Sequence, residues 1–322
     1  MKILDNFKKQ FDTEINIYLD KKIKSAERID KKGGDLLKII KEFINNGGKR
    51  SRPAIFYYAF LSYASQNSAK VLKFYFIFEL FHSFALIHDD IIDNSDLRRG
   101  KPTVHKKYDL STAILAGDLA LMLADEIFSQ EINDKKIIDL YNEFKQELLI
   151  GEYLDTVKIN DVDKIMELKT ARYSFIKPAI IAFSLVKVDK QDIKKWEEIL
   201  RKTGILFQIK DDFDGTFADE KSLGKPTDSD IKEGKNTLLI EKFLNKSNSK
   251  EKEHFYSFFG RPYLKTEDLI WYKKTLIKYK IDDEIKNKIA NESIEIENKL
   301  NLYFPDITLS ELIKEILVKI KI

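Results

Sequence analysis

Residues 74–93 read FYFIFELFHSFALIHDDIID, and this stretch is the best guide to the architecture of the chain. It contains neither Gly nor Pro, and its apolar side chains recur at three- and four-residue spacing, which is typical of a buried α-helix. Twelve Gly and six Pro among all 322 residues are about half the usual share. Because sheet folds of this length need more turn residues, the sequence predicts an all-α protein.

We expect one domain, residues 1–322, because no linker, internal repeat or change of composition divides the chain. Pro178 is expected to kink or split the helix in which it lies. The predicted helices cover residues 2–29, 35–45, 51–66, 68–94, 110–129, 134–158, 161–187, 190–218, 229–246, 263–279, 281–301 and 307–322.

Charge and cysteine content exclude several classes of protein. With 56 Lys and Arg against 53 Asp and Glu, the net charge of +3 is too balanced for binding nucleic acid by bulk attraction. The absence of Cys excludes disulfides and thiolate metal sites. Lys73, Glu79 and His82 interrupt the longest apolar region, residues 71–87, so we expect no membrane span. No signal peptide is recognisable, and we expect a cytoplasmic protein.

The predicted helix ends in Asp89, Asp90 and Asp93, which we call the first acidic cluster. These carboxylates repel one another, and the helix dipole disfavours anions at a C-terminal end. Mg²⁺ would relieve the repulsion, and Arg98 and Arg99 follow closely with guanidiniums suited to a diphosphate. Taken alone, the carboxylates could equally form a solvated helix end and the arginines surface salt bridges.

Asp211 and Asp212 form a second acidic cluster, and they lie three and four residues after Gln208. All three side chains can therefore project from one side of a helix. Lys225 and Lys235 follow, each in a Gly-Lys pair. Carboxylates again precede basic residues, so we expect two acidic walls that face one cavity.

Residues 47–53, GGKRSRP, which we call the basic loop, supply two glycines and three cations ahead of a predicted helix. A helix N-terminus with such neighbours is suited to anions. The spacing of a Walker loop is absent. A basic turn on the surface is the alternative for this segment considered alone.

Together these segments resemble the trans-isoprenyl diphosphate synthases, the family of farnesyl and geranylgeranyl diphosphate synthases. The similarity covers residues 40–240, approximately. Its motifs occur in the family's order: GGKRSRP (47–53), DDIID (89–93) with LRRGKPTVH (97–105), AGD (116–118), LKT (168–170), GILFQIKDD (204–212), LGKP (223–226) and EGKNT (233–237).

The resemblance implies an all-α helical bundle around a deep central cavity, in a homodimer. It also implies chain elongation, in which Mg²⁺, three ions per site, assists the ionisation of an allylic diphosphate and isopentenyl diphosphate attacks the resulting cation. The charge on the departing diphosphate then needs cations, and no protein nucleophile is required.

The resemblance also assigns roles to individual residues. The Mg²⁺ ligands would be Asp89, Asp90, Asp93, Asp211 and Asp212. The allylic diphosphate would meet Arg98, Lys169, Thr170, Gln208, Lys225 and Lys235, and isopentenyl diphosphate would meet Lys49, Arg52, His82 and Arg99. Asp89, Asp90, Asp93, Arg98, Lys169, Asp211 and Lys225 are the expected catalytic residues.

Lys169 and His82 have ordinary interpretations beside these roles. A lysine on a helix is usually a solvated surface residue, so only the LKT motif favours a site role for Lys169. A lone histidine on an aromatic helix is usually a core residue. His82, however, lies seven residues before Asp89 and therefore on the same helix face, which favours a ligand role.

The second acidic cluster departs from the family pattern at one position. Gly215 stands where many members have a third Asp, and Asp214 occupies the neighbouring position. Either Asp214 has taken over the role of the third carboxylate, or water replaces it. We still expect activity, because the remaining residues of the motif are present.

The residues before the first acidic cluster bear on product length, because the family uses bulky side chains there as a floor. Ala85 and Phe81 lie about 6 and 12 Å beneath Asp89 along the helix, and Phe84 is offset to the side. A small residue four before Asp89 and an aromatic one five before it resemble archaeal geranylgeranyl diphosphate synthases. We expect geranylgeranyl diphosphate, with a farnesyl or longer product as the alternative.

Two other functions remain open. A class I terpene cyclase also uses D-D-x-x-D and Mg²⁺, but it has no use for the basic loop and Arg99. A non-catalytic subunit of a heteromeric synthase would be expected to have lost the acidic motifs, and both are present apart from Gly215.

Overall fold

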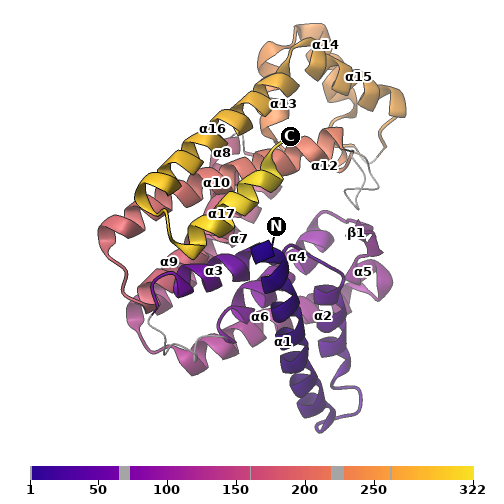
Figure 1. The fold of residues 1–322 in the computed structure, drawn as a ribbon. Coiled ribbons are helices and arrows are strands. Elements are labelled where there is room, and N and C mark those ends of the chain that lie inside the picture. Colours follow the sequence, from indigo (N-terminus) through magenta and orange to yellow (C-terminus); the bar gives the residue numbers. More distant parts are fainter. Residues whose placement is uncertain (1, 65–72, 160, 219–227, 262) are drawn as a thin grey trace. The chain divides into compact units, whose positions relative to one another are not determined.

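Helices make up nearly all of the regular structure in the computed structural model, which describes residues 2–64, 73–159, 161–218, 228–261 and 263–322 (Figure 1). The all-α prediction is therefore confirmed. In the described residues, no helix combines the length and the apolar character needed to cross a bilayer. Lys225 and the LGKP segment lie outside the described residues.

The chain folds into two compact units, and it passes between them three times, within α7, within α9 and between α9 and α10. Unit 1 consists of Met1–Asp139 and Ile181–Lys187, and unit 2 of Leu140–Ile180 and Val188–Ile322.

Unit 1 is built on the pairing of α4 with α6. Its elements are α1 (Lys2–Glu27), α2 (Asp35–Asn45), α3 (Ser51–Leu61), α4 (Phe76–Ile92), β1 (Leu97–Arg98), β2 (Lys101–Pro102), α5 (Val104–Lys107) and α6 (Leu110–Glu131). The aromatic side of α4 is buried, and α6 contributes small residues such as Ala113, Ala116 and Ala120. At Gly117, an added Cβ would stand 2.4 Å from Nε2 of His88, so glycine allows the two helices to approach.

Unit 2 is built around α10. Its elements are α7 (Lys135–Thr156) from Leu140 onward, α8 (Val162–Met166), the π-helix η2 (Glu167–Ile176), α9 (Lys177–Leu185) up to Ile180, α10 (Lys190–Phe217), α12 (Ser229–Glu233), α13 (Leu238–Lys246), α14 (Ser249–Phe258), α15 (Thr266–Lys278), α16 (Ile281–Tyr303) and α17 (Thr308–Ile320). At Gly204 on α10, an added Cβ would lie 2.5 Å from Cα of Ala171 on η2. The AGD and GILFQIKDD motifs therefore each place glycine where two helices meet.

The structure differs from the predicted helices at several points. The helix predicted over 229–246 is split into α12 and α13, because Gly234 adopts a left-handed φ of 68°. Helix α14 was not predicted, although Asn248 and Glu251 form a capping box at its start. The helix predicted over 161–187 becomes α8, η2 and α9, with Pro178 in the first turn of α9, in agreement with the predicted split.

Candidate active site

The first acidic cluster lies at the end of α4, where Arg98 compensates for its repulsion. The strands β1 and β2 form a hairpin that returns Arg98 to the helix end. Its Nη2 donates to Oδ2 of Asp89 at 3.0 Å, and its Nε donates to Oδ1 of Asp90 at 2.7 Å. Asp93 forms the C-cap of the helix. The structure therefore brings these four predicted residues together.

Asp90 carries the most perturbed carboxylate of this cluster, with only 1% of the residue exposed. Burial raises the pKa of Asp90 to about 6, Arg98 opposes the shift, and the charges of Asp89 and Asp93 add to it. Its Oδ2 is buried and has no hydrogen-bond partner among the described residues. A carboxylate oxygen without a donor matches the hard oxygen ligands that Mg²⁺ prefers, so the donor set fits that ion.

No group of three acidic or histidine side chains suited to a metal ion is assembled in the described part of the chain. At phosphate sites one or two carboxylates usually hold Mg²⁺, and substrate oxygens and water complete its shell.

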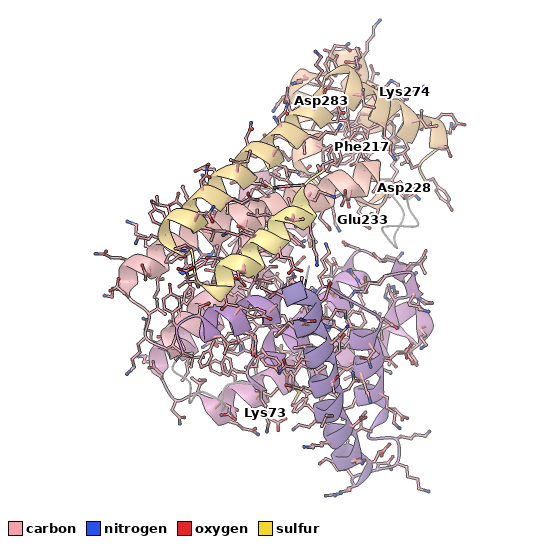
Figure 2. All side chains as sticks on the ribbon, in the orientation of Figure 1. Lys73, Phe217, Asp228, Glu233, Lys274 and Asp283 are labelled. Atoms are coloured by element: carbon pink, nitrogen blue, oxygen red, sulfur yellow. The ribbon has the colours of Figure 1, made fainter. Side chains whose placement is uncertain are left out.

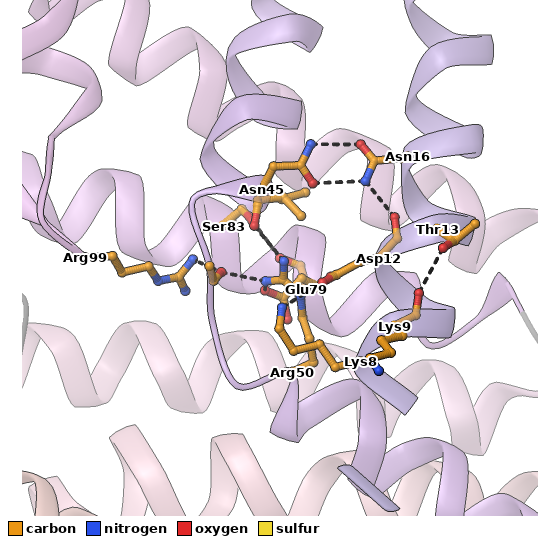
Figure 3. Close-up of polar contacts among 12 residues, drawn as sticks. Lys8, Lys9, Asp12, Thr13, Asn16, Asn45, Arg50, Glu79, Ser83 and Arg99 are labelled. Carbon is orange, nitrogen blue, oxygen red and sulfur yellow. Dashed lines mark hydrogen bonds and ion pairs between the residues drawn. The ribbon is translucent and has the colours of Figure 1, made fainter. Parts of the chain in front are cut away.

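The basic loop is fixed by Arg50, a residue that the sequence analysis did not single out (Figure 3). Its side chain is fully buried, with Nε 2.7 Å from Oδ1 of Asp12 and Nη1 2.5 Å from Oε1 of Glu79. It also donates to the carbonyls of Ile44 and Gly47 at 2.6 and 2.9 Å. Glu79 could have indicated such a residue, because a carboxylate within an apolar helix needs a cationic partner.

Arg99 joins the same loop from the hairpin, and its Nη1 donates to the carbonyl of Gly47 (Figure 3). A Cβ on Gly48 would meet Nη1 of Arg50 at 2.8 Å and Nη2 of Arg99 at 2.9 Å. Burial and the neighbouring guanidiniums lower the pKa of Arg99 to about 10, against the influence of Glu79. Gly48 is therefore required where two guanidiniums converge on the backbone.

His82 lies among these cations, two turns before Asp89 on α4. Burial and the charges of Arg52, Arg99, Arg98 and Arg50 hold its pKa well below the usual range, so the ring is neutral near pH 7. Arg52 belongs to the first turn of α3, and Lys49 is exposed just before it. The four residues predicted for isopentenyl diphosphate thus belong to one basic region of unit 1, where an anion would be attracted.

In unit 2, a chain of hydrogen bonds orders the second acidic cluster. The hydroxyl of Thr170 donates to Oε1 of Gln208, and Nε2 of Gln208 donates to Oδ1 of Asp212 at 2.7 Å. Asp212 is buried and Asp211 is exposed. Thr170 lies on the π-helix η2, a type of helix that is rare and common at functional sites.

The two described lysines predicted for the allylic diphosphate are each neutralised within unit 2. Nζ of Lys169 lies 2.7 Å from Glu152 and 2.5 Å from Asp155, both on α7. Nζ of Lys235 lies 2.7 Å from Glu233. Binding of a diphosphate would therefore have to compete with carboxylates for these two amines.

Asp214, the expected substitute for the third carboxylate, forms an ion pair with Lys210 one turn earlier on α10. Its charge is thus compensated on its own helix.

Phe81 and Phe84, two of the three residues predicted to set product length, are buried in unit 1. The ring of Phe84 lies 5.4 Å from that of Phe81 and 4.8 Å from that of His88. His88 is in turn seated against Gly117, as described above. Phe84 is therefore held in place from both sides, while Ala85 is half-buried.

Comparison with known proteins places these motifs in a family. The model of the polyprenyl synthetase family matches residues 34–274. The geranylgeranyl diphosphate synthase of Sulfolobus acidocaldarius is 33% identical over 77% of this chain and 80% of its own. The short chain isoprenyl diphosphate synthase of Methanocaldococcus jannaschii is 31% identical over 82% and 80%.

A solved structure is similar over nearly the whole length. The geranylgeranyl pyrophosphate synthase of Corynebacterium glutamicum, complexed with isoprenyl diphosphate and magnesium, has a TM-score of 0.87 and 25% identity, with 98% of each chain covered. Fold, motif order and sequence identity agree, and the chain belongs to the polyprenyl synthetase family.

Proposed function

We propose that the protein is a prenyltransferase that condenses isopentenyl diphosphate with an allylic diphosphate to give geranylgeranyl diphosphate. The observation that carries this proposal is the arrangement in unit 1, where Arg98 bridges Asp89 and Asp90 and where Arg50 and Arg99 both bind the carbonyl of Gly47 in the basic loop. An anion site beside carboxylates that fit Mg²⁺ is what two diphosphate substrates require. Relatives named as geranylgeranyl diphosphate synthases support the choice of product.

The reaction breaks the carbon–oxygen bond of the allylic diphosphate and forms a carbon–carbon bond with the isopentenyl double bond, after which the condensed cation loses a proton to the released diphosphate. Bound Mg²⁺, proposed as three ions per site, would stabilise the charge of the departing diphosphate. Asp89, Asp90 and Asp93 in unit 1 and Asp211 and Asp212 in unit 2 are proposed to hold these ions. Two units that act on one substrate pair would form a single catalytic domain, which we also propose.

The remaining side chains bind and orient the substrates. Lys49, Arg52, His82 and Arg99 are proposed to hold isopentenyl diphosphate, and the electrostatic influence of Arg52 and Arg99 on His82 supports this for three of them. The allylic diphosphate is proposed to meet a second set of residues, namely Arg98, Lys169, Thr170, Gln208, Lys225 and Lys235. Arg98 is suited to this role because it already bridges Asp89 and Asp90. A diphosphate bound to Mg²⁺ at these two carboxylates would therefore lie within reach of its guanidinium.

Phe84, with Phe81 beneath it, is proposed as the floor that stops chain growth. The contact of Phe84 with His88 supports this role, because a floor must not yield to the growing chain. Phe84→Ala should therefore shift radiolabelled products to longer chains, whereas Phe183→Ala, at another buried aromatic residue of unit 1, should not. If Phe84→Ala left the product length unchanged, Phe84 would not be the residue that stops chain growth.

A homodimer is proposed from the surface of α6. Large apolar residues lie exposed along this helix, at Leu110, Ile114, Leu115 and Met122. An apolar row on a surface helix is a common sign of a protein interface. Sedimentation of the purified chain would test this proposal.

The proposed activity is tested by incubating the full chain with Mg²⁺, isopentenyl diphosphate and each allylic primer in turn. We expect incorporation of isopentenyl label into a twenty-carbon diphosphate. Release of diphosphate without isopentenyl incorporation would indicate a cyclase, and no turnover with any primer would contradict catalysis by this chain.

A further inference from the structure

Arg50 is unusual among the charged residues of the chain because its side chain is fully enclosed. Charged side chains such as Lys274 and Asp283 are exposed on their helices (Figure 2). The side chain of Arg50 has no exposed surface, so it is not available to a substrate. A buried ion pair adds little stability compared with apolar packing, so its presence here points to conformational specificity.

The backbone that Arg50 holds is strained. Gly47 and Gly48 have φ angles of 117° and 124°, and Arg50 itself has a left-handed φ of 54°. Such a conformation costs free energy in a non-glycine residue, and it persists where surrounding contacts determine it. The guanidinium supplies those contacts, because it donates to the carbonyl of Gly47 and to that of Ile44 in the last turn of α2.

Three of the four residues proposed for isopentenyl diphosphate are attached directly to this strained loop. Lys49 precedes Arg50 in the chain, and Arg52 follows it in the first turn of α3. Arg99 comes from the hairpin and donates to the same carbonyl of Gly47 that Arg50 binds. The direction in which each of these cations leaves the backbone therefore depends on the shape of the loop.

Glu79 extends the same network to the fourth residue, His82. The two residues are three apart on α4, so they share a side of the helix. The carboxylate of Glu79 lies 2.5 Å from Nη1 of Arg50, and breaking a buried ion pair is strongly unfavourable. The position of α4 and its histidine relative to the loop is therefore also tied to Arg50.

We propose that Arg50 is a positioning residue for isopentenyl diphosphate, which sets the spacing of the four proposed ligands of that substrate without touching it. This inference rests on the proposed function, to which those ligands belong. A guanidinium suits the role, since its three nitrogen atoms bind two carbonyls and two carboxylates in fixed directions, whereas an ammonium is a compact point charge.

The test is Arg50→Lys in the full chain, which keeps the charge and loses the planar fork. With the allylic primer saturating, the KM for isopentenyl diphosphate should rise about tenfold, the scale of coupling within one hydrogen-bond network, while kcat and the KM for the primer change by less than about twofold. A purely structural role would instead lower the folded fraction and the apparent kcat, and it would leave KM unaltered. An unaltered KM for isopentenyl diphosphate in folded Arg50→Lys therefore overturns the proposal.

Lys177→Gln is the matched control, because it removes another buried cation, held by Glu143 and Glu147 in unit 2. It should lower the melting temperature and leave the KM for isopentenyl diphosphate unchanged. If it raised that KM as much as Arg50→Lys does, loss of any buried charge would be sufficient, and Arg50 would have no positioning role.

Isothermal titration with isopentenyl diphosphate covers the case in which Arg50→Lys does not fold. Asp12→Ala then removes the partly exposed partner of Arg50, and the Kd for isopentenyl diphosphate should weaken by about threefold. Unfolded protein would lower only the stoichiometry, and an unaltered Kd in Asp12→Ala would overturn the proposal. Failure of the proposed function looks different, because the unaltered chain would then bind isopentenyl diphosphate but transfer no prenyl group.

Discussion

The first and second acidic clusters carry similar sequence motifs, yet their carboxylates are stabilised in different ways. In the first, Arg98 compensates for Asp89 and Asp90 from a hairpin that follows the helix directly. In the second, the neutral side chains of Thr170 on η2 and Gln208 on α10 order Asp212. The first cluster is therefore complete within one short stretch of sequence, whereas the second depends on tertiary structure.

The largest effect is expected at the first cluster, whose carboxylates all lie at the end of α4. Asp89→Asn removes a proposed Mg²⁺ ligand and leaves Arg98 with one carboxylate partner. We expect kcat to fall by about 10³-fold, the scale for the loss of a group that stabilises transition-state charge. Steady-state kinetics with the preferred primer measures this. A loss of less than tenfold in a folded protein would contradict the role of Asp89.

The next effect concerns the stability of unit 1 rather than its chemistry. Glu79→Gln leaves the buried guanidinium of Arg50 with Asp12 as its remaining carboxylate partner, at a cost of about 3 kcal/mol in the free energy of unfolding. Urea denaturation measures the change.

Glu131→Gln, at an exposed carboxylate near the end of α6, is the matched control and should change stability little. If both variants lost the same free energy of unfolding, the buried ion pair of Arg50 with Glu79 would not stabilise the basic loop.

The smallest effect is expected in the neutral network of the second cluster. Thr170→Val preserves the shape of the side chain and removes the donor to Gln208, which costs about 1 kcal/mol and lowers kcat/KM for the allylic diphosphate by about fivefold. Thr203→Val, at a buried hydroxyl on α10 that bonds its own helix backbone, should leave kcat/KM unchanged. If Thr203→Val lowered kcat/KM more than Thr170→Val does, the hydrogen bond from Thr170 would not be what orients Gln208 for the substrate.

Local patterns predicted most of the fold, and they failed where tertiary contacts decide. Helix α2 was predicted over its full range, because its apolar spacing and its boundaries are both local features. The break at Gly234 depends on a left-handed turn, and a helical pattern does not reveal it. The motifs identified the candidate residues of both clusters. Arg50 was missed, because the sequence does not show which residue the buried Glu79 lies against.

The central claim is that both acidic clusters act on one metal–diphosphate assembly, and a double-mutant cycle on Mn²⁺ binding tests it most directly. Free Mn²⁺ is measured by electron paramagnetic resonance, with inorganic diphosphate present, for Asp89→Asn, Asp211→Asn and the double variant. Each single variant is expected to weaken Mn²⁺ binding. The double variant is expected to lose much less binding free energy than the sum of the losses in the two single variants. Losses that simply add would show two independent sites and contradict it.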